Sequence, residues 1–146
     1  LHTELEAEPF ARDEMCAVLP PSSPLAAQQT VTLEELAQYP FLLREPGSSG
    51  RTILEASFAL RQLAVRPVWE SASTQAILRA AAEGLGVAVL PERMARRAAE
   101  DGDVCLRPLA DPIERTLHIV WHKSKYRTQT MQSFQTLCRS AGTGKL

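Results

Sequence analysis

The chain has 146 residues, and its 16 Lys or Arg and 17 Asp or Glu leave a formal net charge of −1. This balance excludes the strongly basic surface by which many proteins bind nucleic acid. No apolar run approaches the roughly 18 residues of a membrane span, and the first residues lack the basic and apolar segments of a signal peptide. We therefore expect a cytoplasmic protein with no membrane partner.

Three cysteines, Cys16, Cys105 and Cys138, lie far apart without a Cys-x-x-Cys spacing. An odd, scattered set is typical of a reducing compartment, in which cysteines serve as small apolar residues. The composition therefore predicts no disulfide, no metal site and no cofactor.

The first predicted element is a buried strand over residues 15–19, which ends at a pair of prolines. Small and polar residues fill positions 22–30, a composition that favours a crossing between subdomains over a place in a core. Thr32 and Glu35 have the Ser/Thr-x-x-Glu spacing of a capping box, and Pro40 requires the helix that follows to be short.

The stretch 41–51, FLLREPGSSGR, carries the first candidate site. Its apolar start predicts a buried strand, and the Pro-Gly pair breaks that strand into a loop that opens a helix at about Thr52. The hydroxyls of Ser48 and Ser49 would lie beside the unpaired N–H groups at the start of this helix, which suits a carboxylate, sulfate or phosphate group. The alternative is a helix cap that binds only its own backbone.

The helix over residues 52–64 has two apolar patches. Helical spacing predicts a core face that consists of Ile53, Ala56, Leu60 and Leu63. Leu54 and Phe58 fall outside this stripe and form an i,i+4 pair. A second apolar patch on a surface helix marks a partner interface, unless a neighbouring loop covers it.

Strands and helices alternate over the next segment. A strand is predicted over residues 65–70, followed by several candidate helix caps from Ser71 to Thr74 and by a helix that Gly84 closes. The apolar run 87–90 is the next strand. This alternation predicts a mostly parallel sheet covered by helices.

The last third of the chain is predicted to contain a short basic helix over residues 92–100 and strands over residues 104–109 and 116–121. Prolines near residues 108–112 indicate a second crossing between subdomains. The final helix begins near Thr128, and its inward face is expected to consist of Met131, Phe134, Leu137 and Cys138.

Several motifs do not support an enzyme. Gly84-Leu85-Gly86 lies between a helix and a strand, the reverse of the order in a dinucleotide fingerprint, and so indicates capping and close packing. His118 and His122 lie on a predicted strand about 13 Å apart, too far to share a metal ion. The Gly-Ser-Ser-Gly loop is one residue short of a serine hydrolase elbow. We therefore expect no catalytic activity.

The order of the segments FLLREPGSSGR, WESASTQAI and AAEGLGVAVLP, followed by a Pro-Ile-x-Arg-x-Leu-x-Ile-Val-Trp strand and a Met-x-x-Phe helix, resembles the effector-binding region of LysR-type transcriptional regulators. The resemblance covers residues 5–138. It implies an α/β fold similar to type II periplasmic binding proteins, with a mixed, mostly parallel sheet and a small effector in the cleft between two subdomains. On this basis residues 22–111 form one complete subdomain, and residues 1–21 and 112–146 form part of the other.

The family's N-terminal winged helix-turn-helix, its linker helix and the first strands of its first subdomain have no counterpart in this sequence. The resemblance therefore implies a ligand-sensing piece of a bacterial regulator, which reaches DNA only through the missing winged helix-turn-helix. A stand-alone solute-binding protein of the same fold is the alternative function. A cytoplasmic enzyme on this fold would need a strongly perturbed acid, base or nucleophile in the cleft.

The resemblance also implies which residues bind the effector. The matching positions are Gly47, Ser48 and Ser49 of the loop and Ser71, Ser73 and Thr74 at the next helix start. Arg51 would add positive charge to the same site, or else pair with Glu45 or Glu55. The expected ligand is a small anionic effector.

Effector regions of this family pair side by side, with the helix after the ligand loop at the subunit boundary. In this chain that helix carries Leu54 and Phe58, so the resemblance implies an interface there. Unpaired strand edges of the incomplete subdomain provide a second route to self-association. We expect a dimer or a larger assembly.

Overall fold

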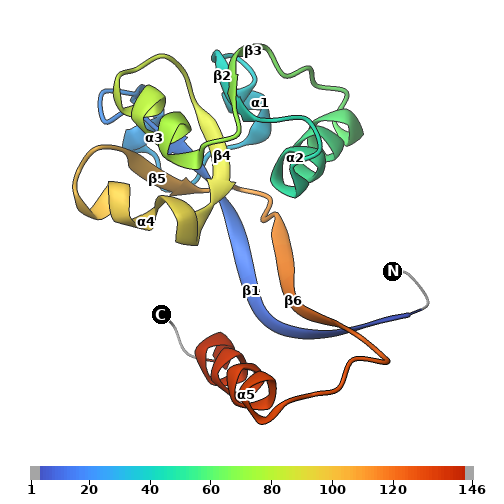
Figure 1. Cartoon of the computed structure of the whole chain (residues 1–146). Helices are drawn as coiled ribbons and strands as arrows, with labels where there is room; N and C mark the ends of the chain where they lie inside the picture. Colours follow the sequence, from blue (N-terminus) through green and yellow to red (C-terminus); the bar gives the residue numbers. More distant parts are fainter. Residues whose placement is uncertain (1–3, 144–146) are drawn as a thin grey trace. The chain divides into compact units, whose positions relative to one another are not determined.

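The computed structural model describes residues 4–143 and has an α/β fold (Figure 1). Its strands are β1 (Leu5–Leu19), β2 (Phe41–Arg44), β3 (Pro67–Ser71), β4 (Ala88–Pro91), β5 (Cys105–Pro108) and β6 (Glu114–His122). Its helices are the 3-10 turn η1 (Pro24–Ala27) and α1 (Leu33–Leu36), α2 (Ser49–Leu60), α3 (Thr74–Ala82), α4 (Glu92–Glu100) and α5 (Gln129–Thr143). The predicted fold class is confirmed. Within residues 4–143, no helix has the length and apolar character that crossing a membrane requires.

The chain divides into two compact units. The smaller unit combines Leu1–Asp13 with Glu114–Leu146, and the larger unit is Glu14–Ile113. The first division therefore falls inside β1, because this strand is long enough to contribute one half to each unit. The subdomain boundaries expected near residues 21 and 111 stay a prediction about the family's architecture.

The sheets of the larger unit are mixed, as predicted. β2 and β3 pair in parallel, and a parallel bridge joins Phe41 to Val87 at the entry to β4. In contrast, β1 pairs antiparallel with both β4 and β5. Parallel pairing is therefore less extensive than the alternation suggested, because β1 precedes the series of strands that α2 and α3 connect and runs in the opposite direction.

The central position of β1 explains the burial of its second half. Residues 15–19 lie between β4 and β5 and are all buried, which confirms the predicted strand. Because side chains alternate along a strand, Met15, Ala17 and Leu19 join one core cluster with α1 and α2, whereas Val18 joins a second with α3 and α4.

The prediction of which face of α2 is buried was wrong. Leu54 and Phe58 are only 2% and 1% exposed, and the Phe58 ring packs edge-on against Phe41 at a centroid distance of 5.3 Å. Leu60, expected in the core, is 85% exposed. A leucine and a phenylalanine bury more apolar area than a stripe containing alanine, and Phe41 of β2 provides the partner surface. The expected interface at Leu54 and Phe58 is therefore wrong, because these side chains belong to the core.

The local signals around α1 and α3 are confirmed. The Glu35 N–H donates to Thr32 Oγ1 at 3.1 Å, and the Thr32 N–H donates to Glu35 Oε2 at 2.8 Å, which completes the capping box. Gly84 adopts a left-handed φ of +76° after α3. A Cβ on Gly86 would lie 2.5 Å from the Pro40 carbonyl oxygen, so this glycine permits close packing.

The stretch 22–30 does not lie outside the core as expected. It contains η1, and Leu25 on this turn is buried in the cluster around Met15. The Ser23 hydroxyl accepts from the Leu25 N–H at 3.3 Å and so caps the turn. Sequence composition identified the polar residues correctly but missed that Leu25 is buried and that Ala26 packs against the same cluster.

The smaller unit contains the first half of β1, β6 and α5. β1 begins at Leu5, well before the predicted strand, and pairs with β6. On α5 the predicted inward positions Phe134 and Leu137 are exposed, whereas Gln135 is buried. The prediction is therefore wrong for Phe134 and Leu137, whereas the other two predicted positions, Met131 and Cys138, are partly buried.

Candidate functional site

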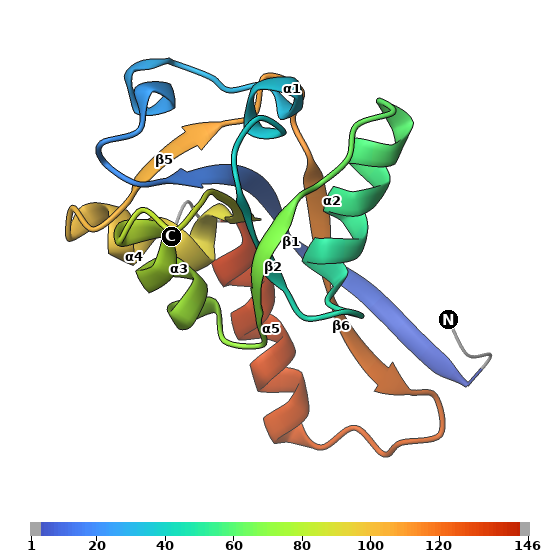
Figure 2. The ribbon, with the colours of Figure 1, turned by 90° about the horizontal axis from the view of Figure 1, so that it is seen from above.

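The candidate site lies where β2 and β3 end. These strands are parallel, with Arg44 opposite Ser71, so their carboxyl ends meet at one edge of the sheet. Helix α2 follows β2 and helix α3 follows β3, and Figure 2 shows the two helices on either side of the strand pair. The structure therefore brings the 45–49 loop and the 71–74 turn to the same edge, although they are far apart in the sequence.

The loop after β2 presents two serine side chains. Gly47 has a φ of +87°, which lets the chain turn sharply into α2. Ser48 occupies the N-cap position, but its hydroxyl makes no capping hydrogen bond. Among residues 4–143, the structure gives no hydrogen-bond partner to the hydroxyl of Ser48 or of Ser49. The helix begins at Ser49, three residues before the predicted start, so both serines lie at its N-terminus.

The turn after β3 uses its hydroxyls differently. Ser71 Oγ accepts from the Ser73 N–H at 3.1 Å, and Ser73 Oγ caps α3 by accepting from the Ala76 N–H at 3.3 Å. Thr74 Oγ1 accepts from Arg44 Nη1 at 2.9 Å. All three hydroxyl oxygens therefore act as acceptors toward the protein, and their protons remain for other partners.

Arg51 takes the alternative role that the sequence left open. Its guanidinium pairs with Glu55 at 2.7 Å and Glu70 at 2.9 Å, and it donates to the Arg44 carbonyl oxygen at 2.9 Å. The hydrogen bonds that Arg51 donates to Glu55 and Glu70 raise the pKa of Arg51 above its ordinary value. These bonds tie the start of α2 to the ends of β2 and β3, so the positive charge of Arg51 is already paired within the protein.

Arg44 lies at the candidate site and was not singled out from the sequence. Its Nε and Nη2 donate to the two carboxylate oxygens of Glu45 at 2.8 and 3.0 Å, while Nη1 reaches Thr74. The hydrogen bond from Arg44 lowers the pKa of Glu45. The one available signal was the adjacent Arg-Glu pair at the end of a predicted strand, and this pair does not indicate the contact with Thr74.

The charges at this edge are matched within the protein. Two guanidinium groups, Arg44 and Arg51, contact three carboxylates, those of Glu45, Glu55 and Glu70. A ligand would therefore meet hydroxyl groups and helix N–H groups rather than an uncompensated cation. Such groups donate hydrogen bonds to a carboxylate, sulfate or phosphate oxygen.

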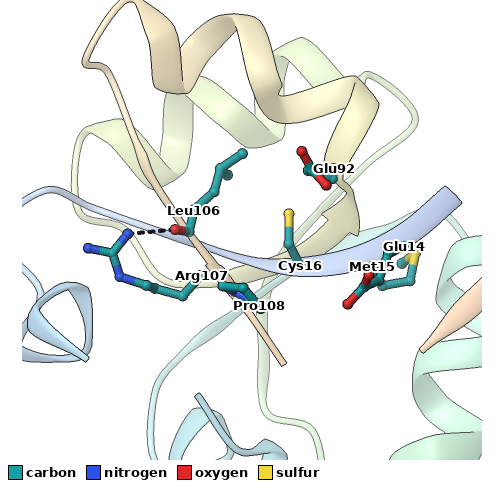
Figure 3. A pocket seen from close by; sticks show the side chains of 7 residues that line it. All are labelled: Glu14, Met15, Cys16, Glu92, Leu106, Arg107 and Pro108. Atoms are coloured by element: carbon teal, nitrogen blue, oxygen red, sulfur yellow. Dashed lines mark hydrogen bonds between the residues drawn. The ribbon is translucent and has the colours of Figure 1, made fainter. Parts of the chain in front are cut away.

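A separate pocket of about 270 Å³ lies in the larger unit (Figure 3). Its lining comes from β1, β5 and the start of α4 and consists of Glu14, Met15, Cys16, Glu92, Leu106, Arg107 and Pro108. Figure 3 shows the Arg107 guanidinium turned to the Leu106 carbonyl oxygen, to which it donates at 2.7 Å. The carboxylates of Glu14 and Glu92 disfavour an anion in this pocket. None of the residues predicted for the effector lines it.

Each of the two histidines of β6 has a polar contact with an oxygen atom of the protein. His118 Nδ1 lies 3.2 Å from the Thr116 carbonyl oxygen, and His122 Nε2 lies 3.0 Å from Glu4 Oε2. Both histidines lie on a strand, as predicted. Residues 4–143 contain no group of three or more His, Cys, Asp or Glu side chains that fits a metal ion.

Comparison with known proteins identifies the family. Residues 1–143 match the family described as LysR substrate binding domain. The uncharacterized HTH-type transcriptional regulator YeiE of Escherichia coli K12 is 32% identical over 142 residues, which are 95% of this chain and 47% of that protein. The chain thus spans about half the length of the curated relatives it matches.

Solved structures agree on the fold. The regulatory domain of CcmR from Synechocystis PCC6803, solved in complex with 2-PG, superposes with a TM-score of 0.87 at 22% identity, covering 99% of this chain and 70% of that one. HinK, a LysR family transcriptional regulator from Pseudomonas aeruginosa, superposes with a TM-score of 0.85 at 25% identity, covering 97% of this chain and 49% of that one. The chain belongs to the LysR substrate binding domain family.

Proposed function

We propose that this chain senses a small anion for a LysR-type transcriptional regulator. The observation that carries the proposal is the meeting of two helix N-termini, those of α2 and α3, at one sheet edge where the Ser48 and Ser49 hydroxyls have no protein partner among the described residues. The N-terminal end of each helix carries unpaired N–H groups and partial positive charge. An anion at this edge would accept hydrogen bonds from the unpaired N–H groups and would be attracted by the partial positive charge of the helix ends.

The ligand that accompanies CcmR supports a small-molecule effector. That protein's regulatory domain was solved in complex with 2-PG, and its fold matches this chain. The anionic character of the effector in this chain rests instead on its own hydroxyls and helix ends. The competing reading, a stand-alone solute-binding protein, has no supporting feature in the described residues beyond the shared fold.

Regulation would follow from the family's two-subdomain arrangement. An effector that contacts both subdomains changes their closure, or the pairing of subunits, only if it binds one arrangement more tightly than another. The longer protein would then contact DNA through its winged helix-turn-helix, in the cytoplasm of a bacterium. In this proposal the chain itself contributes ligand binding and no catalysis.

The proposed site is tested by measuring ligand affinity in serine variants. Carboxylates, sulfate and phosphate are first screened by thermal shift, and the tightest ligand is then titrated by calorimetry. A hydroxyl bonded to a charged ligand contributes about 1.5 to 3 kcal/mol, so Ser49→Ala should weaken binding roughly ten-fold or more. Ser57→Ala is the control, because Ser57 Oγ donates to the Ile53 carbonyl oxygen further along α2. Unchanged affinity in both Ser48→Ala and Ser49→Ala would remove the loop from the site.

Self-association is the second part of the proposal. The outward face of α2 carries Leu60, and the neighbouring strand β3 exposes Val68 and Trp69. Exposed large apolar side chains on a helix and on an edge strand favour contact with another protein surface. We propose that a second copy of the chain covers Leu60. This contact replaces the one expected at Leu54 and Phe58.

A further inference from the structure

Arg44 connects the two segments of the proposed effector site. It ends β2, binds Glu45 in the loop before α2 with two hydrogen bonds of 2.8 and 3.0 Å, and donates to Thr74 at the start of α3 with one of 2.9 Å. Its side chain is largely covered. A planar guanidinium holds its donors in a fixed fork that suits two partners in set directions, whereas the three donors of an ammonium group rotate. The position of α3 relative to the 45–49 loop therefore depends on Arg44.

The bond to Thr74 also sets the direction of that hydroxyl. Because Thr74 Oγ1 accepts from a charged donor, its own O–H points elsewhere and is polarised as a donor. The hydroxyl oxygens of Ser71 and Ser73 likewise accept from backbone N–H groups. The turn after β3 thus leaves three hydroxyl protons available to donate to a ligand that binds there.

This arrangement discriminates between ligand groups. Once a ligand excludes water, a hydroxyl proton without an acceptor costs free energy. A carboxylate, sulfate or phosphate presents only acceptor oxygens. A primary amide presents one acceptor oxygen and one donor NH2, and an ammonium group presents only donors, so these groups leave some or all of the hydroxyl protons unmatched. The edge therefore favours an oxyanion, although both guanidinium groups there are already paired with carboxylates.

We propose that Arg44 is a positioning and specificity-determining residue, which fixes the donor direction of Thr74 so that the site selects an oxyanion through neutral hydroxyl groups. This inference rests on the proposed effector site and specifies its ligand class. Arg44 acts through Thr74 and does not contact the ligand. The loss of ligand affinity in a variant without Arg44 and without the Thr74 hydroxyl should therefore be smaller than the sum of the two single losses.

The test is a double-mutant cycle on the full chain with sodium sulfate as the probe. Sulfate is titrated against sodium chloride of matched ionic strength, and binding is followed through the backbone amide signals of Ser49 and Ala76. Arg44→Met and Thr74→Val should each weaken sulfate binding roughly ten-fold, and the double variant should be no weaker than about ten-fold. Thr74→Ser keeps the hydroxyl and should bind as the parent does. A double variant weakened about a hundred-fold would overturn the inference, because it would mean that Arg44 contacts the anion independently.

Selectivity provides a readout that a purely structural role would not change. The parent chain should bind acetate more tightly than acetamide, and this preference should shrink in Arg44→Met. Arg44→Lys provides the same comparison if Arg44→Met does not fold, since lysine keeps the charge but not the fork. Equal binding of acetate and acetamide by a parent that binds sulfate would overturn this inference but not the proposed effector site. A parent that binds no oxyanion at this edge would refute the proposed effector site itself, and with it the inference.

Discussion

Asp13 and Arg115 form a buried ion pair between β1 and β6. Asp13 Oδ2 accepts from Arg115 Nη2 at 2.8 Å and from Nε at 3.2 Å, and the two side chains are 2% and 19% exposed. Both residues belong to the smaller unit, next to the points where the chain passes to and from the larger one. A buried pair of this kind stabilises a fold mainly because either partner alone would be an uncompensated buried charge.

Arg115→Met should therefore destabilise the chain strongly. The Asp13 carboxylate would remain buried without its partner, which costs about 3 to 5 kcal/mol in comparable buried pairs. The change in the free energy of unfolding is measured by urea denaturation. Arg12→Met is a matched control on the same pair of strands, because the Arg12–Glu114 pair is exposed and 3.8 Å apart. That control should cost less than about 1 kcal/mol, and equal losses in the two variants would contradict the role of burial.

The capping box predicts a pH dependence of stability. The backbone N–H of Thr32, with the side chains of Gln28 and Thr32, lowers the pKa of Glu35 from its ordinary value of 4.5. A carboxyl whose pKa is lower in the folded state contributes stability above its unfolded pKa, and this contribution is lost as pH falls through the folded pKa. The parent should therefore exceed Glu35→Gln in stability near neutral pH. Urea denaturation should show this difference shrinking as the pH falls below 4.5, and a difference that stays unchanged throughout the acid range would argue against the charged cap.

The backbone conformation of Gln62 leads us to expect that a substitution there stabilises the chain. It follows α2 with a φ of +58°, and it is the one residue other than glycine in the described chain with a positive φ. A side chain in this region costs about 1 kcal/mol, which glycine avoids. Gln62→Gly should therefore raise the free energy of unfolding by about 0.5 to 1 kcal/mol. Ala56→Gly, at an exposed position in the interior of the same helix, should lower it by a similar amount, so two changes of the same sign would refute the explanation.

Replacing Gly86 should destabilise the chain, in contrast to replacing Gln62 by glycine. An added Cβ would lie 2.5 Å from the Pro40 carbonyl oxygen and 3.3 Å from Leu42 Cγ, beside the hydrogen bond from Val87 N–H to that same oxygen. Gly86→Ala should force β2 and the start of β4 apart, at a cost of about 1 to 3 kcal/mol. Gly50→Ala is the control, because its nearest neighbour is a flexible methionine end at 3.6 Å and alanine favours the helix. Calorimetric unfolding should show a lower Tm for Gly86→Ala alone.

The features that could be predicted from the sequence depend on residues close together in the chain. The capping box of Thr32 and Glu35, the buried run of β2 and the glycine cap after α3 all fall in this class. The contact of Arg44 with Thr74 spans 30 residues and exists only because β2 and β3 are parallel neighbours. Sequence patterns within either segment hold no information about that pairing.

The buried face of α2 and the pocket around Cys16 could not be predicted for the same physical reason. Periodicity ranked the two faces of α2 by the number of apolar residues, yet the contact between Phe58 and Phe41 decides which face is buried. The pocket around Cys16 draws its lining from three separate segments of the chain. In both cases the deciding interaction is tertiary, and a single sequence without known strand order does not specify it.

The corrected position of α2 leads to the last prediction, which concerns self-association. Leu60 is the most exposed large apolar side chain among the described residues, at 85%. If a second copy covers it, Leu60→Glu places a charge in an apolar contact and should shift the chain from dimer to monomer in sedimentation experiments. Leu85→Glu changes an equally apolar but separate position, 54% exposed after α3, and should leave the dimer intact. A Leu60→Glu variant that remains dimeric would place the contact elsewhere, and a parent chain that sediments as a monomer at high concentration would refute self-association of this chain.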